Sequence, residues 1–123
     1  MDRNTLLLQL ATENYCYLTT TGRVSGRPHE IEIWFGAHNN TLYLLSSGGD
    51  KSDWVKNLLK TPAVSVRVKG QRFMGTARIV KDEQEEGIAR NLLADKYKER
   101  AADGSLSEWA QTALPIAIDI EGE

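Results

Sequence analysis

Short segments in which apolar and polar residues alternate recur along the chain, and turn residues separate them. Such alternation is typical of β-strands with one buried face. In the clearest segment, residues 28–36, the side chains would point to opposite faces of a sheet, with Ile31, Ile33 and Phe35 on one face and Glu30, Glu32 and Trp34 on the other. The next residues, His38, Asn39 and Asn40, favour a hairpin turn.

The same criteria predict the other elements. Strands are expected at residues 15–21, 28–36, 41–45, 64–68, 72–80 and 114–120. Helices are expected at residues 3–14, 52–60 and 82–100, with a short one around 108–110. Closely spaced strands with few helices predict a mainly β fold with some α structure (α+β), in which a β-barrel carries helices on its outside. The chain of 123 residues fits a single domain, 1–123.

Four local features refine these elements. Ser52 is a good N-cap for the helix that follows it, and Asp82 with Glu85 has the spacing of a capping box. Gly75 inside an alternating segment predicts a bulge or a sharp bend. Pro115, at the start of the last strand, is compatible with an edge position, because proline cannot donate a hydrogen bond to a neighbouring strand.

Two glycine-containing turns are candidates for a ligand site. Gly22 and Gly26 flank the first turn, which carries Arg23, Ser25 and Arg27. The second turn, residues 46–49, reads Ser-Ser-Gly-Gly and leads into the helix after Ser52. Each turn alone is compatible with a plain solvated loop. Together, their backbone N–H groups, guanidinium groups and helix N-terminus favour an anionic ligand held between them.

Composition excludes several classes of function. The net charge of −2 argues against a general nucleic-acid binder. The chain has no apolar run long enough to span a membrane, and Leu6-Leu7-Leu8 is too short for a signal peptide, so a cytoplasmic protein is expected. The single cysteine, Cys16, excludes an internal disulfide and a cysteine-cluster zinc site. His29 and Glu30 are too few to hold a metal and would face opposite sides of a strand, so no metal site is expected.

Three motifs in this spacing carry a family resemblance: Thr-Thr-Gly-Arg-x-Ser-Gly from Thr20, Ser-x-Gly-Gly from Ser46, and Trp-x-x-Asn-Leu from Trp54. The combination resembles the deazaflavin (F420)-dependent nitroreductase family, part of the flavin and deazaflavin oxidoreductases with an FMN-binding-like split β-barrel fold. The similarity runs from about Tyr17 to Val68 and resumes weakly at Trp109 and residues 114–116.

The resemblance implies a set of cofactor-binding residues on four segments. The loop after the first strand would contact the phosphate and tail, the next strand would run under the ring, the loop after the following strand would lie beside the phosphate, and a helix would close the site. In chain order these residues are Arg23, Val24, Ser25 and Arg27; His29, Ile31, Ile33 and Trp34; Leu45, Ser46, Ser47 and Gly48; and Asp53, Trp54 and Asn57.

The sequence departs from the family pattern at several of these positions. His29 stands where nitroreductase-type members have an arginine, and Ser47 stands where some have a lysine. Less positive charge would face the anionic tail of coenzyme F420, so FMN remains an alternative cofactor. Leu106 and Asp103 stand where some members carry substrate-contacting tyrosines before the tryptophan that matches Trp109, so the resemblance says little about the substrate.

The implied function is an oxidoreductase in which reduced F420 transfers hydride to a small conjugated or electron-poor acceptor, such as a quinone, an enone or a nitro compound. No catalytic side chain is expected, because the cofactor carries the chemistry. The alternatives are an FMN-dependent reductase or oxidase of the same fold, a non-catalytic module that binds a flavin or tetrapyrrole, and a structural protein without a small ligand. Barrels of this type often pair, so a homodimer is favoured.

Two tryptophans have alternative interpretations. Trp34 would cover the ring of the cofactor or lie in a dimer interface, where tryptophan is favoured. Trp54 would contact the cofactor or anchor its helix to the core.

Overall fold

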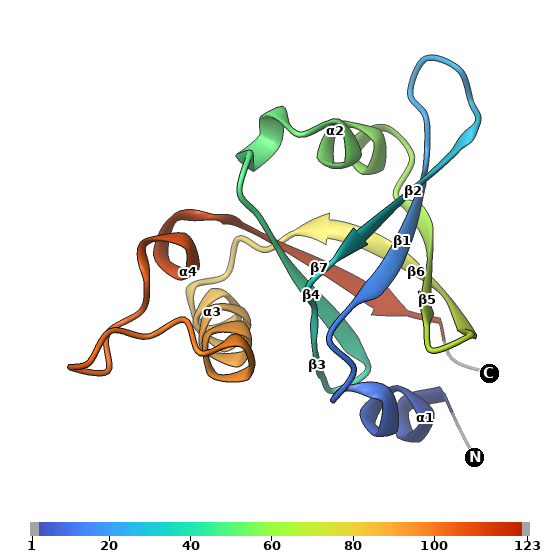
Figure 1. The fold of residues 1–123 in the computed structure, drawn as a ribbon. Coiled ribbons are helices and arrows are strands. Elements are labelled where there is room, and N and C mark those ends of the chain that lie inside the picture. Colours follow the sequence, from blue (N-terminus) through green and yellow to red (C-terminus); the bar gives the residue numbers. More distant parts are fainter. Residues whose placement is uncertain (1–2, 122–123) are drawn as a thin grey trace.

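A computed structural model describes residues 3–121, and its strands form one antiparallel sheet in the order β2-β1-β5-β6-β7-β4-β3 (Figure 1). The strands are β1 (Cys16–Thr21), β2 (Pro28–Ile33), β3 (Gly36–His38), β4 (Thr41–Ser46), β5 (Ala63–Val68), β6 (Gln71–Ile79) and β7 (Leu114–Ile120). The helices are α1 (Arg3–Leu10), α2 (Asp53–Lys60), α3 (Glu83–Tyr97) and α4 (Glu108–Thr112), with a 3-10 turn η1 (Gly49–Lys51) before α2.

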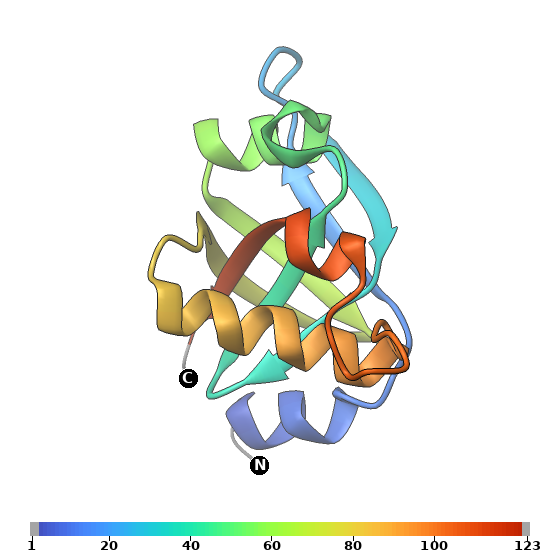
Figure 2. The same cartoon turned by 90° about the vertical axis from the view of Figure 1, so that its left-hand side faces the viewer.

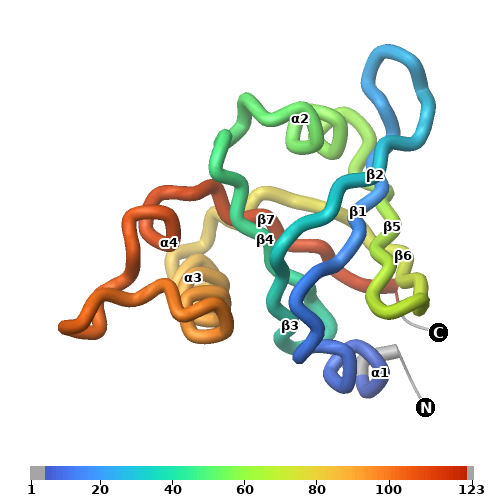
Figure 3. The backbone as a smooth tube through the Cα atoms, viewed as in Figure 1, coloured from blue at the N-terminus to red at the C-terminus, as the bar shows by residue number. Residues whose placement is uncertain are grey.

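The two edge strands of this sheet follow one another in the chain. Only Trp34 and Phe35 separate the end of β2 from the start of β3. A sheet whose edges are joined so closely has to curl around its own axis, and Figure 3 shows the backbone passing from β2 directly into β3. The result is a split half-barrel with helices on its outside, so the predicted fold is confirmed.

The inside of the barrel forms the main core. Large side chains that are fully buried, including Leu18, Leu44, Phe73 and Ile118, alternate with outward-facing residues along their strands. Helix α2 covers one end of the barrel and α1 the other, as Figure 2 shows, and each adds buried side chains. These are Leu7 from α1, and Val55 and Leu58 from α2.

A second, smaller core lies between the sheet and the C-terminal helices. Tyr43 and Leu45 of β4 and Ala117 of β7 point outward and pack beneath α3, where Ala89 and Leu93 are fully buried. Strand β4 is therefore buried on both faces, which explains its continuous apolar run 42–45.

Several predicted boundaries differ from the structure. The expected strand 28–36 ends at Ile33, because the chain has to turn there to reach the other edge of the sheet. The first helix ends at Leu10, and α3 ends at Tyr97, where Lys98 takes a left-handed conformation with φ of 58° and terminates the helix.

Pro115 does not lie in an edge strand, because β7 lies inside the sheet between β6 and β4. Pairing with β6 begins only at Ile116, opposite Ile79, so Pro115 lies just beyond the end of that strand. The missing N–H of proline therefore costs no hydrogen bond to β6, and its carbonyl accepts one from the N–H of Val80 at 3.0 Å.

Of the two features predicted at Gly75, a bulge or a sharp bend, the bulge is wrong, because the pairing register of β6 runs without interruption on both sides. The glycine is needed for close approach of β7 instead. A Cβ atom at this position would lie 2.7 Å from Cγ2 of Ile118 and 2.8 Å from the carbonyl oxygen of Asp119.

Half of the predicted capping box forms. The Asp82 side chain accepts a hydrogen bond from the N–H of Glu85 at 2.9 Å, as expected for an N-cap. The Glu85 side chain does not reach back to Asp82. It accepts hydrogen bonds from Arg78 at 2.6 and 2.7 Å and one from the Tyr43 hydroxyl at 2.7 Å.

Arg78 joins two carboxylates on neighbouring elements. Its guanidinium group also donates to Asp119 at 2.7 and 3.1 Å, so it is bidentate toward β7 as well as toward α3. The hydrogen bonds from Arg78 to Glu85 lower the pKa of Glu85 from 4.5 to about 2. Those from Arg78 to Asp119 lower the pKa of Asp119. The cluster ties α3 to the outer face of the sheet.

This cluster predicts an acid-sensitive contribution to stability. Replacing Glu85→Gln should lower the free energy of unfolding by about 1–3 kcal/mol at neutral pH. Because the pKa of Glu85 is depressed in the folded state, its contribution is present above about 4.5 and is lost as the pH falls toward about 2. Denaturant unfolding of both proteins across this pH range measures the difference.

Glu83→Gln is the matched control, because Glu83 lies in the exposed first turn of α3 and forms no ion pair within residues 3–121. It should change stability by less than about 0.5 kcal/mol at any pH. Equal pH profiles for the Glu85→Gln variant and the wild type would contradict the assignment.

Candidate functional site

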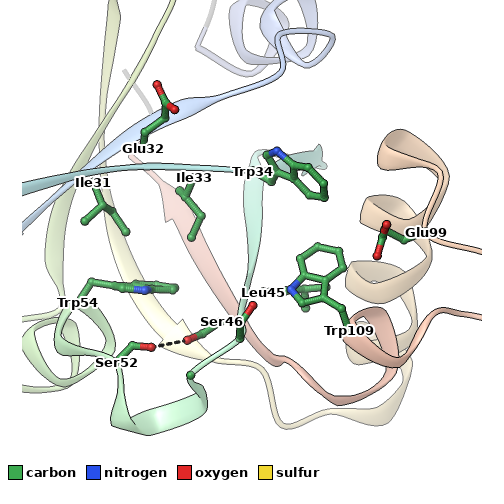
Figure 4. Close-up of a pocket in the computed structure, with 12 residues that line it drawn as sticks. Ile31, Glu32, Ile33, Trp34, Leu45, Ser46, Ser52, Trp54, Glu99 and Trp109 are labelled. Atoms are coloured by element: carbon green, nitrogen blue, oxygen red, sulfur yellow. Dashed lines mark hydrogen bonds between the residues drawn. The ribbon is translucent and has the colours of Figure 1, made fainter.

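Two adjoining clefts form one groove along β2, between the β1–β2 hairpin and the segment from α3 to α4. The larger, of about 550 Å³, lies under β2 and is called here the tryptophan cleft (Figure 4). The smaller, of about 480 Å³, lies beside the hairpin loop and is called the hairpin cleft. Both are lined by Ile31 of β2 and Trp54 of α2, so the two clefts adjoin at these side chains.

Arg23 connects the hairpin loop to α2. Its guanidinium group donates to the side chain of Asp53 at 3.1 Å and to Oδ1 of Asn57 at 2.9 Å. Its backbone N–H donates to the same Asn57 oxygen at 3.1 Å, and its carbonyl accepts from Nζ of Lys60 at 2.8 Å. The positive charge of Arg23 is thus partly neutralised within the chain before any ligand binds.

Asn57 is the buried centre of this network. Only 5% of its surface is exposed, and its amide nitrogen donates to the Thr20 hydroxyl of β1 at 3.3 Å while its oxygen accepts from Arg23. Burial of an amide is costly unless its hydrogen bonds are made, and here both ends have partners. Asn57 therefore fixes the position of the hairpin relative to α2.

Several backbone N–H groups of the hairpin turn donate hydrogen bonds to acceptors within the turn itself. Those of Gly22 and Gly26 donate to backbone carbonyls of the turn at 2.8 and 2.9 Å, and that of Arg27 donates to the Ser25 hydroxyl at 3.1 Å. Val24, at the tip of the loop, is 94% exposed. A Cβ atom at Gly22 would lie 2.6 Å from Nε2 of His29, whose side chain is exposed and free to move.

Aromatic rings form the far wall of the tryptophan cleft. The ring of Trp34 stacks on that of Tyr97, with centroids 4.1 Å apart, and meets the ring of Trp109 edge-on at 5.5 Å. Trp34 is half-buried beside these two rings of its own chain, and both of its interpretations, as a cofactor contact and as a dimer contact, remain predictions.

The wall is held in place from α3. The hydroxyl of Tyr97 accepts from the N–H of Phe35 at 3.0 Å and donates to the carbonyl of Asn14 at 2.7 Å. Nζ of Lys96 donates to the carbonyl of Phe35 at 2.8 Å. Burial lowers the pKa of Lys96 to about 8 and raises the pKa of Tyr97 to about 12.

The loop after β4 closes the bottom of the tryptophan cleft. The buried hydroxyl of Ser46 donates to the carbonyl of Gly49 at 3.0 Å and lies 3.0 Å from the hydroxyl of Ser52. Ser52 therefore holds the loop rather than capping α2 with its side chain, which differs from the prediction. A Cβ atom at Gly48 would collide with Oγ of Ser52, and Gly49 has φ of 63°.

The groove brings together all the residues predicted for cofactor binding except Arg27. The tryptophan cleft contains Ile31, Ile33, Trp34, Leu45, Ser46, Ser47, Gly48 and Trp54. The hairpin cleft contains Arg23, Val24, Ser25, His29, Ile31, Asp53, Trp54 and Asn57. Arg27 is exposed and lines neither cleft. Their role in binding remains a prediction.

The structure adds lining residues that sequence reasoning did not select. Trp109 and Glu99 enter the tryptophan cleft from the α3–α4 segment, at least 45 positions after Trp54, which is the nearest of the other lining residues in the chain. The family resemblance included Trp109, so the sequence pointed to this residue. No motif pointed to Glu99, which lies in a loop. Trp54 packs against the core, as one of its two interpretations expects, and it lines both clefts; its contact with a cofactor remains a prediction.

Residues 3–121 contain neither a cluster of metal ligands nor a membrane-spanning helix. Within this range, no group of three or more His, Cys, Asp and Glu side chains is placed to hold a metal ion. No helix in the same range is long and apolar enough to cross a membrane.

The curled sheet and the groove define a split-barrel protein of the type that binds flavins or F420. The family model of the F420H(2)-dependent quinone reductases matches residues 3–121, so the chain belongs to this family of F420-dependent oxidoreductases. A comparison with curated proteins gives no match.

Solved structures agree with this assignment. An F420-H2 dependent reductase is 26% identical with a TM-score of 0.65, covering 88% of this chain and 94% of its own. A conserved hypothetical protein from Mycobacterium tuberculosis is 17% identical with a TM-score of 0.75, covering 98% and 81%. An FAD-binding protein from Mesorhizobium loti is 16% identical with a TM-score of 0.68, covering 98% and 91%. The last two similarities show the fold alone.

The Asn57 network predicts a local effect of mutation. Asn57→Ala should lower the free energy of unfolding by about 1–3 kcal/mol, because it leaves partners of a buried amide unpaired. It should also speed hydrogen exchange at the amide of Arg23, which loses its acceptor. Mass spectrometry of exchange in residues 17–30 measures this.

Lys56→Ala, on the exposed face of the same helix, is the control and should leave both quantities unchanged. Unchanged exchange in the Asn57→Ala hairpin would show that the loop is held by other contacts.

Proposed function

We propose that this protein is a reductase that uses reduced F420 to transfer hydride to a small conjugated or electron-poor acceptor, with quinones first among them. The observation that carries the proposal is the tryptophan cleft, which has isoleucine and tryptophan side chains in its walls beside a serine- and glycine-containing loop, in a chain that matches the quinone reductase family over residues 3–121. Nitro compounds and enones belong to the same acceptor chemistry.

The groove fits a tricyclic cofactor with an anionic tail. The combined clefts have the size of known cofactor sites, and Ile31, Ile33 and Trp54 offer the apolar surfaces that a flat ring needs. Arg23 and His29 are the basic residues that line the groove, and both belong to the hairpin cleft. The phosphate and tail would therefore lie at the hairpin end, and the ring in the tryptophan cleft.

Reduced F420, when bound, supplies a hydride, which together with one proton converts a quinone to a hydroquinone. The chain's own contribution is to orient the ring and acceptor and to exclude water from between them. Three tryptophan rings and the two isoleucines of β2 give the cleft walls that serve this purpose. The proton comes from water or from one of the serine hydroxyls that line the groove.

FMN is the second candidate cofactor, and the pairing of Arg23 with Asp53 favours it. The hairpin cleft also contains Glu30, so its positive and negative side chains nearly balance. Such a site suits one phosphate better than a phosphate followed by several carboxylates. A homodimer is also retained as part of the proposal.

Binding and turnover test the proposal together. Purified protein should quench F420 fluorescence with micromolar or tighter affinity, and should oxidise reduced F420 in the presence of menadione. Trp54→Ala should weaken F420 binding by about tenfold, since stacking on an indole ring is lost. Tyr15→Ala is the control, because Tyr15 is 46% exposed and lines neither cleft.

A flat titration would count against F420 as the cofactor. Native mass spectrometry of the protein mixed with both F420 and FMN then reports which one is retained and how many chains assemble. Binding without turnover on quinones, enones and nitro compounds would favour the non-catalytic module.

A further inference from the structure

The charges that line the groove are distributed unevenly. Lysine, arginine and histidine side chains are absent from the lining of the tryptophan cleft, whereas the hairpin cleft contains Arg23 and His29. Two glutamates, Glu32 and Glu99, line the tryptophan cleft. The Glu32 carboxylate accepts a hydrogen bond from Tyr17 at 2.7 Å and points away from Trp54 in Figure 4, so Glu99 is the acidic group that faces this space.

Glu99 is held in a defined position. The hydroxyl of Ser107 donates to its Oε1 at 3.0 Å, and the N–H of Ser107 donates to its carbonyl at 2.9 Å. No Lys, Arg or His within residues 3–121 forms an ion pair with Glu99. Its side chain is half-buried and lies beside the rings of Trp34 and Trp109 in Figure 4. The carboxylate therefore presents an uncompensated negative charge to this end of the groove.

The two ends of the groove would bind different groups: the tail of the cofactor at one end, and the cofactor ring with the acceptor at the other. With the anionic tail of the cofactor at the hairpin end, the acceptor has to approach the ring within the tryptophan cleft, where Glu99 lies. A negative charge between apolar walls repels an anion more strongly than the same charge in open water would.

We propose that Glu99 is a specificity-determining residue that selects neutral and cationic acceptors and disfavours anionic ones. This inference rests on the proposed function. It adds to that function the charge class of the substrate: a flat, electron-poor ring without a carboxylate, sulfonate or phosphate near the reducible group.

The test compares two acceptors of similar size but different charge, menadione and a naphthoquinone sulfonate, with reduced F420 as the donor. Glu99→Gln keeps the shape of the side chain and an oxygen that can accept from Ser107. The variant should lower the ratio of kcat/KM for menadione to that for the sulfonate by about tenfold, mainly through KM of the sulfonate. Taking the ratio of variant to wild type cancels the difference in reduction potential between the two quinones.

Glu83→Gln is the matched control, since it removes one negative charge from the exposed first turn of α3, outside both clefts. It should leave the ratio unchanged. Added salt should lower the ratio of kcat/KM for menadione to that for the sulfonate in the wild type, and should change this ratio less in the Glu99→Gln variant. Thermal unfolding of both variants establishes that they are folded.

The outcomes separate the two claims. A ratio that is the same in the Glu99→Gln variant and the wild type, in folded and active enzyme, overturns the role of Glu99 and leaves the reductase assignment intact. Wild-type protein that reduces neither quinone overturns the proposed function, and the role of Glu99 falls with it. A selective loss of discrimination in the Glu99→Gln variant alone supports both.

Discussion

The joint between β2 and β3 is the constraint on which the rest of the molecule depends. At this point the chain leaves one edge of the sheet and enters the other, so the backbone of Phe35 cannot complete its hydrogen bonds within a regular strand. The hydroxyl of Tyr97 and the ammonium group of Lys96 supply the missing partners from α3. The same contact stacks Trp34 against Tyr97, so closure of the barrel and placement of the cleft wall share one set of bonds.

The other wall of the groove depends on α2. This helix seals one end of the barrel through Val55 and Leu58, and its polar side reaches the hairpin through Asn57 and Asp53. A helix of eight residues is too short to be stable alone, so its position comes from these tertiary contacts. The groove is thus built between two helices that the barrel itself orders.

The sequence was a good guide to elements and a weaker one to their connections. The predicted ends of β1, β4, β5, β6 and β7 lie within one residue of the observed ends, because a half-buried strand shows its inner face directly in its sequence, whereas β2 ends three residues earlier than predicted. The break after Ile33 and the interior place of Pro115 depend on which strands become neighbours, which is a property of the whole sheet. The need for a glycine at position 75 shows the same limit of sequence-based prediction, because it comes from the close approach of Ile118 on another strand.

The candidate site also contains residues that the sequence could predict and residues that it could not. Residues in the two glycine-containing turns and on the intervening strand were found because they form a local motif, and the structure places them along one groove. The internal pairing of Arg23 could not be anticipated, because it requires knowing that Asp53 and Asn57 lie opposite the loop. Glu99 was missed because its neighbours in space come from a distant part of the chain.

The first helix and the last strand bring the described chain to the side of the barrel opposite the hairpin loop and α2, as Figure 1 shows. Affinity tags, fluorophores or surface tethers attached near either terminus would thus project away from the groove. For practical work this geometry allows the protein to be immobilised or fused to a partner while small molecules still diffuse freely to its opposite side.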